Sequence, residues 1–162
     1  MWRLREDIQT IKENDPSVKS TLEILLTYPS FYAIIFHRVS HSLYKRNRFL
    51  LSRMIANFSR FLTGIEIHPG ATIGRRLFID HGMGVVIGET ATIGNDVVIF
   101  HGVTLGGTGK DTGKRHPTNG NDVLLSEHVQ VLGHITIGDH SKIGASAVVL
   151  SFFSTISSGI NM

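Results

Sequence analysis

The sequence predicts an α+β fold in which an N-terminal helical domain is followed by a parallel β-helix of six-residue repeats. In residues 1–62, apolar side chains recur at helical spacing between short breaks. After Gly64, branched apolar residues recur every six positions, which neither an α-helix nor an isolated hairpin explains. A solenoid explains this period, because each unit forms one flat side and successive coils stack. We expect a helical domain over 1–62, a β-helix over 63–150 with an inserted loop at 107–121, and an atypical C-terminal tail over 151–162.

Short breaks divide the helical region. The first, Asn14-Asp15-Pro16-Ser17, indicates the end of one helix and the start of another, with the proline early in the new helix. The second is Tyr28-Pro29-Ser30, because the residue before a proline disfavours the α conformation. Asn47 is expected to end the next helix, and the last helix should run from about Phe49 to Leu62.

The six-residue repeat forms three runs, and the branched residue at the start of each unit is expected to point into the solenoid. The runs are Ile67, Ile73 and Ile79; Ile87, Ile93, Ile99 and Leu105; and Leu125, Val131, Ile137, Ile143 and Val149. The step from Ile79 to Ile87 has two residues too many. The step of twenty from Leu105 to Leu125 corresponds to three units plus two residues, or to one unit carrying fourteen extra residues. A solenoid accommodates insertions as loops at its corners, so we look for chemistry beside both interruptions.

Composition restricts the compartment and the class of partner. The chain has no cysteine, which excludes disulfides and cysteine-based metal sites. Residues 1–7 contain acids and no apolar run, so no signal peptide is expected, and the longest apolar stretch, near 31–36, is too short to span a bilayer. Basic residues are in excess in the N-terminal third, but their helical spacing favours a solvated helix surface over nucleic-acid binding. We expect a cytoplasmic protein that binds neither a membrane nor nucleic acid.

Motifs beside the two interruptions resemble those of the serine O-acetyltransferases, a family within the hexapeptide-repeat acyltransferase superfamily. The repeat alone indicates the superfamily, whereas the Asp-His, Gly-Gly-Thr-Gly-Lys and Arg-His-Pro elements together indicate the serine enzymes. The resemblance covers about residues 7–149. Its motifs are Gly64-Ile65-Glu66-Ile67-His68-Pro69-Gly70, Ile79-Asp80-His81-Gly82, Val86-Ile87-Gly88-Glu89-Thr90, Gly102-Val103-Thr104-Leu105-Gly106-Gly107-Thr108-Gly109-Lys110 and Lys114-Arg115-His116-Pro117.

The resemblance implies a left-handed β-helix, a hand that the period alone does not fix. It implies an acyltransferase that moves acetyl from acetyl-CoA, its co-substrate, to the hydroxyl of L-serine. The products are O-acetyl-L-serine and CoA, in the first step of cysteine biosynthesis, and no metal is involved. It also implies a homo-oligomer with active sites between neighbouring β-helices, and the short helical region favours a trimer over a hexamer of two trimers. Many members also bind cysteine synthase through a tail that ends in isoleucine.

His81 is the candidate general base. Imidazole can be uncharged at neutral pH and accept the proton of an attacking hydroxyl. His81 also lies at the two-residue interruption, where a side chain can leave the regular wall. A corner histidine that is merely hydrogen-bonded is the structural alternative, but Asp80 before it and the resemblance favour catalysis. By resemblance, Glu66 is the acidic partner that fixes the tautomer of this histidine, although many members have aspartate at that position.

An amino-acid substrate needs acidic groups for its ammonium and basic groups for its carboxylate. By resemblance, Asp80 and Asp15 bind the ammonium group of serine. Arg115 and His116 bind its carboxylate, for which the guanidinium fork is well suited. Asp15 also fits a helix cap before a proline, and Arg115 also fits a mobile basic loop.

Three further positions are assigned to the co-substrate by the resemblance. Gly106 and Gly107 would let the thioester arm run close to backbone amides, and Lys142 matches a position near the CoA phosphates, a surface lysine being the alternative. Residues 151–162 depart from the family pattern, since they lack its prolines and its six-residue step, and Ile160 is not terminal. This departure bears on CoA binding and on the cysteine synthase complex, and Phe152 and Phe153 could instead cap the solenoid.

Three other functions fit parts of the pattern. Another hexapeptide O-acetyltransferase would act on a sugar, a polysaccharide or an antibiotic, and the combination of Asp80 with Arg115 and His116 argues against it. A β-helix zinc enzyme of the carbonic anhydrase type would use His81, His101 and His116 as ligands, but it leaves the Gly-Gly-Thr-Gly-Lys element unexplained. A non-catalytic homologue with an altered C-terminus stays open at this point.

Overall fold

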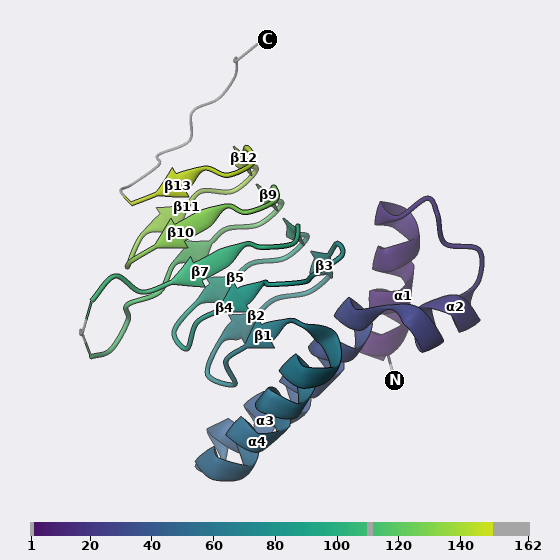
Figure 1. Cartoon of the computed structure of the whole chain (residues 1–162), viewed down its shortest axis with the longest axis horizontal. Coiled ribbons are helices and arrows are strands. Elements are labelled where there is room, and N and C mark those ends of the chain that lie inside the picture. Colours follow the sequence, from purple (N-terminus) through teal and green to yellow (C-terminus); the bar gives the residue numbers. More distant parts are fainter. Residues whose placement is uncertain (1, 110–111, 151–162) are drawn as a thin grey trace, which may run out of the picture.

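A computed structural model describes residues 2–109 and 112–150 of the chain, and these fold into helices followed by short strands (Figure 1). The helices are α1 (Trp2–Asn14), α2 (Thr21–Thr27), α3 (Pro29–Lys45) and α4 (Phe49–Thr63). Helices α3 and α4 pack side by side and project away from the strands (Figure 1). Over these residues, no helix has both the length and the apolar character needed to cross a membrane.

Local hydrogen bonding sets the helix boundaries. The side chain of Asp15 accepts a hydrogen bond from the backbone N–H of Ser17 at 2.8 Å, which stabilises a turn after α1. Pro16 therefore lies in this turn, so the expectation that it begins a helix was wrong. Helix α2 begins only after its N-cap Ser20. Pro29 lies in the first turn of α3, where the missing N–H has no cost.

The strands stack into parallel sheets (Figure 1), and the three sheets form the three faces of a triangular solenoid. Sheet A contains β1 (Glu66–Ile67), β4 (Val86–Ile87), β7 (Thr104–Gly106), β10 (Gln130–Leu132) and β13 (Val148–Val149). Sheet B contains β2 (Thr72–Ile73), β5 (Thr92–Ile93), β8 (Thr118–Asn119) and β11 (Thr136–Ile137). Sheet C contains β3 (Phe78–Ile79), β6 (Val98–Ile99), β9 (Leu124–Leu125) and β12 (Lys142–Ile143).

The register shows the size of both interruptions. Val86 pairs with Thr104, so the coil between them consists of three six-residue units and is regular. The first coil is longer, because Glu66 pairs with Val86, and its two extra residues lie between β3 and β4. Thr104 pairs with Gln130, so the coil that starts at β7 carries eight extra residues, and both alternatives considered above, two and fourteen, are wrong.

Strand β8 lies within the range that sequence analysis assigned to the inserted loop. The loop after β7 therefore spans 107–117, and the chain re-enters sheet B at Thr118. The inward-facing position of β8 is Asn119, which pairs in register with Ile93 below and Ile137 above. Because this position carries an amide in place of a branched apolar residue, the six-residue pattern did not reveal the strand.

Two apolar clusters hold the chain together. The larger one fills the solenoid, where the repeated isoleucine, valine and leucine side chains are almost completely buried. The smaller one contains Ile11, Ile24, Phe31 and Phe78, so it joins the first three helices to strand β3. It fixes α1 and α2 beside the turn that follows β3, which is the first interruption.

Candidate active site

The first interruption forms a six-residue turn between β3 and β4, at the corner shared by sheets C and A. His81 has a left-handed backbone (φ 58°), and its side chain is 76% exposed. Gly82 is also left-handed (φ 72°), and a Cβ there would lie 2.5 Å from Cδ1 of Ile65 in the coil below. Glycine is therefore required at Gly82 by both conformation and space. The turn presents an imidazole that is open to a substrate.

Two carboxylates lie near the His81 imidazole. The Oδ1 atom of Asp80 is 3.8 Å from Nε2 of His81. Asp15 approaches from the turn between α1 and α2, and its carboxylate accepts a 2.5 Å hydrogen bond from the Tyr28 hydroxyl. The pKa of Asp15 is lowered, chiefly by its hydrogen bond with the Ser17 side chain and also by that of Tyr28, with a smaller contribution from the charge of His81. The helical region thus adds an ionised acid to the corner of the β-helix.

Glu66 starts β1, directly below the end of the His81 turn. Its backbone N–H donates to the carbonyl of Val85 at 2.9 Å, and its carboxylate lies 3.0 Å from Nη1 of Arg60 on α4. Among the described residues, Glu66 thus forms its ion pair with Arg60, whereas the carboxylate paired with His81 is that of Asp80. The sequence pattern did not reveal Arg60 as a competing partner, because it comes from a different element.

Two further histidines continue the His81 corner along the solenoid. The His81 and His101 rings have centroids 6.2 Å apart, and the His101 and His128 rings are 5.0 Å apart, both edge to face. The spacing of the first pair could have revealed this contact. His101 follows His81 by the length of the first coil, which is also the separation between Glu66 and its strand partner Val86. Within 2–109 and 112–150, no group of three or more His, Asp or Glu side chains is arranged to hold a metal ion.

Arg115 and His116 lie at the end of the loop between β7 and β8, at the corner shared by sheets A and B. His116 is 8% exposed, and its Nδ1 accepts a 3.2 Å hydrogen bond from the backbone N–H of Thr90. Burial, and secondarily the charge of Arg115, lowers the pKa of His116. The ring is therefore neutral near pH 7 with its proton on Nε2, which makes Nε2–H a hydrogen-bond donor.

A relay that sequence analysis did not assign holds Arg115 in place. The Tyr44 hydroxyl on α3 donates to Oε1 of Glu89 at 2.7 Å, and Oε2 of Glu89 pairs with the Arg115 guanidinium. Hydrogen bonds from Tyr44 first, and then from Arg115, lower the pKa of Glu89. Glu89 was visible within a family motif, but the role of Tyr44 was not, because the two partners lie far apart in the sequence.

Lys114 anchors the same loop to the wall. Its ammonium group donates to the Thr90 carbonyl at 2.5 Å and to the Thr92 hydroxyl at 3.2 Å, and burial lowers its pKa. The Thr90 hydroxyl in turn accepts hydrogen bonds from the backbone N–H groups of Arg115 and His116, at 3.0 and 3.1 Å. The end of the loop is therefore rigidly placed, in contrast to the mobile basic loop considered above.

The residues assigned to the co-substrate do not come together within one chain. Gly106 ends β7 in sheet A, where a Cβ would lie 2.9 Å from Leu132, and Gly107 begins the loop, where a Cβ would lie 3.3 Å from the Arg115 carbonyl. Lys142 is exposed on β12 in sheet C. The glycines thus lie at the corner of sheets A and B, and the lysine lies on a different face.

The site residues form two groups at two different corners. Asp15, Asp80, His81 and Glu66 gather where sheets C and A meet, whereas Arg115 and His116 lie where sheets A and B meet. The loop after β7 extends from one side of the solenoid, and α1 lies beside β3 on the other side (Figure 1). One chain therefore holds an acidic half and a basic half that do not face each other.

Comparisons with known proteins place the chain in one family. No family model matches it. Serine acetyltransferase of Bacillus subtilis is 61% identical over 147 residues, which cover 91% of this chain and 68% of the relative. Serine acetyltransferase in complex with coenzyme A from Brucella abortus has a TM-score of 0.89 at 42% identity, over 93% of this chain and 60% of that one. Soybean serine acetyltransferase complexed with serine has a TM-score of 0.89 at 42% identity, over 93% and 62%.

These similarities confirm the expected fold of N-terminal helices followed by a left-handed parallel β-helix. The chain spans about three fifths of the solved chains that it matches. Its relatives share one chemistry, since they are named as enzymes that transfer an acetyl group to serine. The chain belongs to the serine acetyltransferase family of acyltransferases.

Proposed function

We propose that this chain transfers an acetyl group from acetyl-CoA to the hydroxyl of L-serine, giving O-acetyl-L-serine and CoA. The observation that carries the proposal is the exposed imidazole of His81, held in a left-handed turn beside Asp80 and within electrostatic reach of Asp15. An open base next to two carboxylates suits a substrate that carries a hydroxyl close to an ammonium group. The names of the relatives, which include a complex with serine and a complex with coenzyme A, support the same assignment.

In the proposed reaction, His81 acts as the general base. Its imidazole accepts the serine hydroxyl proton as the hydroxyl oxygen bonds to the thioester carbonyl carbon. The tetrahedral intermediate then collapses, the carbon–sulfur bond breaks, and the imidazolium returns the proton to the departing sulfur, which yields free CoA thiol. Glu66 is proposed to stabilise the imidazolium, in which case its carboxylate must exchange its 3.0 Å contact with Arg60 for one with His81.

The charged ends of serine match the two groups of the site. Asp80 and Asp15 are proposed to bind the ammonium group, and the lowered pKa of Asp15 keeps its carboxylate ionised at neutral pH. Arg115 and His116 are proposed to bind the carboxylate, since a guanidinium and a neutral Nε2–H are both donors. Glu89 supports this role because it pairs with Arg115 and orients the guanidinium.

We further propose that two copies of the chain build each site. Serine is too small to touch both corners of one solenoid, so the acidic half of one copy must meet the basic half of a neighbour, as in a cyclic trimer. A stripe of exposed apolar side chains on α4 supports self-association, because monomeric proteins rarely expose such patches. The stripe contains Leu50, Met54, Phe58 and Phe61, which are 53–85% exposed.

Acetyl-CoA is proposed to lie along the groove between two neighbouring copies. This arrangement allows Gly106 and Gly107 of one copy and Lys142 of another to contribute, although they lie on different faces of a single chain. We also propose a cytoplasmic location for the enzyme. The expectations about the C-terminal segment, including Phe152, Phe153, Ile160 and cysteine synthase, fall on residues 151–162, which lie outside the described residues.

The direct test measures free thiol released from acetyl-CoA by the purified protein, with and without L-serine. We expect serine-dependent release together with formation of O-acetylserine, identified by mass. Glycine, which has the same ammonium and carboxylate groups but no hydroxyl, should give no release above the background rate. Thiol release that is unaffected by L-serine in the folded protein would contradict the proposal.

A further inference from the structure

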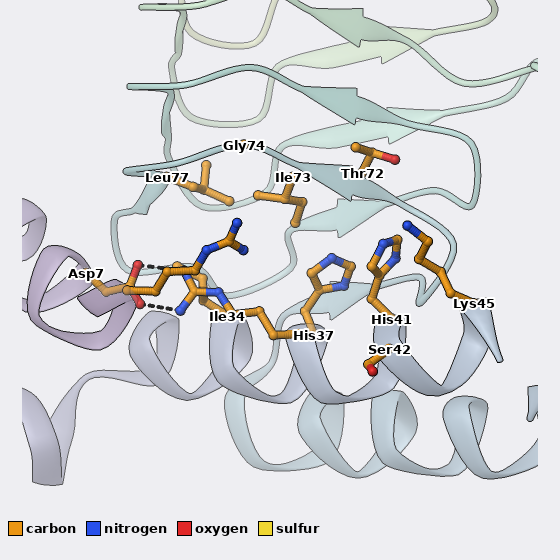
Figure 2. A pocket seen from close by; sticks show the side chains of 12 residues that line it. Asp7, Ile34, His37, His41, Ser42, Lys45, Thr72, Ile73, Gly74 and Leu77 are labelled. Atoms are coloured by element: carbon orange, nitrogen blue, oxygen red, sulfur yellow. Dashed lines mark hydrogen bonds and ion pairs between the residues drawn. The ribbon is translucent and has the colours of Figure 1, made fainter. Parts of the chain in front are cut away.

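A pocket of about 440 Å³ lies between α3 and the first coil of the β-helix, away from the His81 turn (Figure 2). This volume is within the range of pockets that bind small molecules. The side chains of His37, His41 and Lys45 point from one face of α3 toward the strand that carries Thr72 and Ile73 (Figure 2). The residues proposed for acetyl transfer are not among those that line it.

A buried histidine of this pocket has an unsatisfied polar atom. His37 is 6% exposed, and its Nδ1 has no hydrogen-bond partner among the described residues. Burial, with smaller contributions from His41 and Arg38, lowers the pKa of His37 to about 3. The ring is therefore neutral at pH 7, and a neutral imidazole has one N–H donor to offer. Buried polar atoms in native proteins are rarely left without a partner, so this atom indicates a ligand or water.

The pocket carries an excess of positive charge. Arg38 donates two hydrogen bonds to the carboxylate of Asp7, at 2.5 and 2.8 Å, so these two charges are balanced. Lys45 and Arg3 also line the pocket and add two positive charges without a second acid among the lining residues. A ligand that enters beside His37 is thus favoured if it is an anion.

The opposite wall of the pocket is apolar and limits the kind of anion. Ile73 and Leu77 on the first coil line the wall that faces α3, and Ile34 on α3 adds to the apolar surface (Figure 2). Inorganic phosphate would have to give up its hydration against these side chains, which is costly. A carboxylate attached to an aliphatic or aromatic body would instead place its apolar part on this wall.

From this arrangement we propose that the pocket binds a small organic monocarboxylate. The carboxylate accepts the His37 N–H and is attracted by the Lys45 ammonium, while the apolar body lies against Ile73 and Leu77. The binding site is distinct from the proposed serine site, so its occupancy does not depend on the proposed transferase reaction.

The test is a titration of the full chain with sodium benzoate, followed by the histidine ring signals in NMR spectra. We expect the His37 signals to shift and saturate with a Kd on the order of 1 mM, as for a ligand of few atoms. Benzamide, which has the same shape without the charge, should give no saturable shift. Inorganic phosphate at the same ionic strength should also give none. A response to phosphate without one to benzoate, or no saturable response to either, would overturn the proposal.

Substitutions then locate the ligand through saturation transfer to the benzoate protons. Lys45→Met should raise the Kd by about tenfold or more, because a charge-assisted contact is lost, and His37→Phe should abolish binding. Lys19→Met, which removes an exposed lysine outside the pocket, should leave the Kd unchanged. If His37→Phe does not fold, Lys45→Met decides the question alone. Binding that survives in Lys45→Met but is lost in Arg115→Ala would place benzoate at the proposed serine site and refute binding in the pocket beside α3.

Discussion

Three histidines of the described residues, His81, His128 and His140, share a rare backbone conformation, and two of them provide a matched pair of substitutions. His81 and His140 are both left-handed, with φ of 58° and 60°. Asparagine tolerates this conformation better than most residues, so it removes the imidazole with little strain. We expect His81→Asn to lower serine-dependent turnover by about 10²–10⁴-fold, the usual contribution of a general base. His140→Asn should retain normal turnover, and equal rates in the two variants would remove His81 from the mechanism.

The buried amide of Asn119 weakens the solenoid at one point. Neither its Oδ1 nor its Nδ2 has a hydrogen-bond partner among the described residues, although the residue is only 1% exposed. Asn119→Ile would continue the stack of isoleucine side chains from Ile93 to Ile137 and remove a buried amide without partners. The free energy of unfolding should therefore increase by about 1–3 kcal/mol. We expect the melting temperature to rise by about 2–4 °C per kcal/mol. The matched change Asn121→Ile should lower it, because that amide bonds to Asn95 and Asp139.

His37 should make the folded chain sensitive to acid. Burial lowers the pKa of His37 from 6.5 in the unfolded chain to about 3 in the folded chain, so above pH 6.5 the ring is neutral in both states. Below pH 6.5 the unfolded chain binds a proton that the folded chain does not. The free energy of unfolding therefore decreases as the pH is lowered from 6.5 to about 3, by at most about 1.4 kcal/mol per pH unit. Denaturant unfolding at several pH values should show a shallower fall for His37→Phe than for wild type or for His134→Phe, a change at an exposed position. Parallel curves would argue against a neutral buried ring.

At the scale of elements, the six-residue period was enough to predict the β-helix, because inward-facing residues must be apolar wherever coils stack. The period failed at β8, where Asn119 breaks the apolar series. The helix start expected at Pro16 was also wrong, because the Asp15 side chain stabilises a turn there. Motifs indicated the site residues, but their partners belong to other elements. Arg60 beside Glu66 and Tyr44 behind Glu89 depend on how the helices pack against the solenoid, which periodicity does not specify.

The contact between α3 and the wall of the solenoid should influence serine binding. Tyr44→Phe removes the hydroxyl that holds Glu89, and Glu89 then holds Arg115 less firmly. We expect the KM for serine to rise by about 3- to 10-fold with little change in kcat, since a single hydrogen bond to a charged group is lost. Tyr32→Phe, on the same helix, removes a hydroxyl that bonds to the Leu25 carbonyl and should leave the KM unchanged. A selective loss of kcat in Tyr44→Phe would contradict this positioning role.

At the scale of the whole molecule, the triangular solenoid separates the acidic and basic halves of the site. The turn that carries His81 joins sheets C and A, and the loop that carries Arg115 joins sheets A and B, so a rigid β-helix keeps them apart. Association of identical copies is then the simplest way to complete a site, because each copy offers one half to each neighbour. The geometry makes a prediction about mixtures of defective chains.

His81→Asn and Arg115→Ala should each abolish most serine-dependent thiol release when assayed alone. In mixed oligomers formed by co-expression, some sites combine an intact His81 from one copy with an intact Arg115 from its neighbour. Random assembly of a cyclic trimer from equal amounts makes about a quarter of the sites complete in this way, so about a quarter of wild-type turnover should return. Mixing the purified proteins without subunit exchange is the control and should restore none. If co-expressed chains stay as inactive as the separate variants, each chain builds its own site, and the two corners do not cooperate between copies.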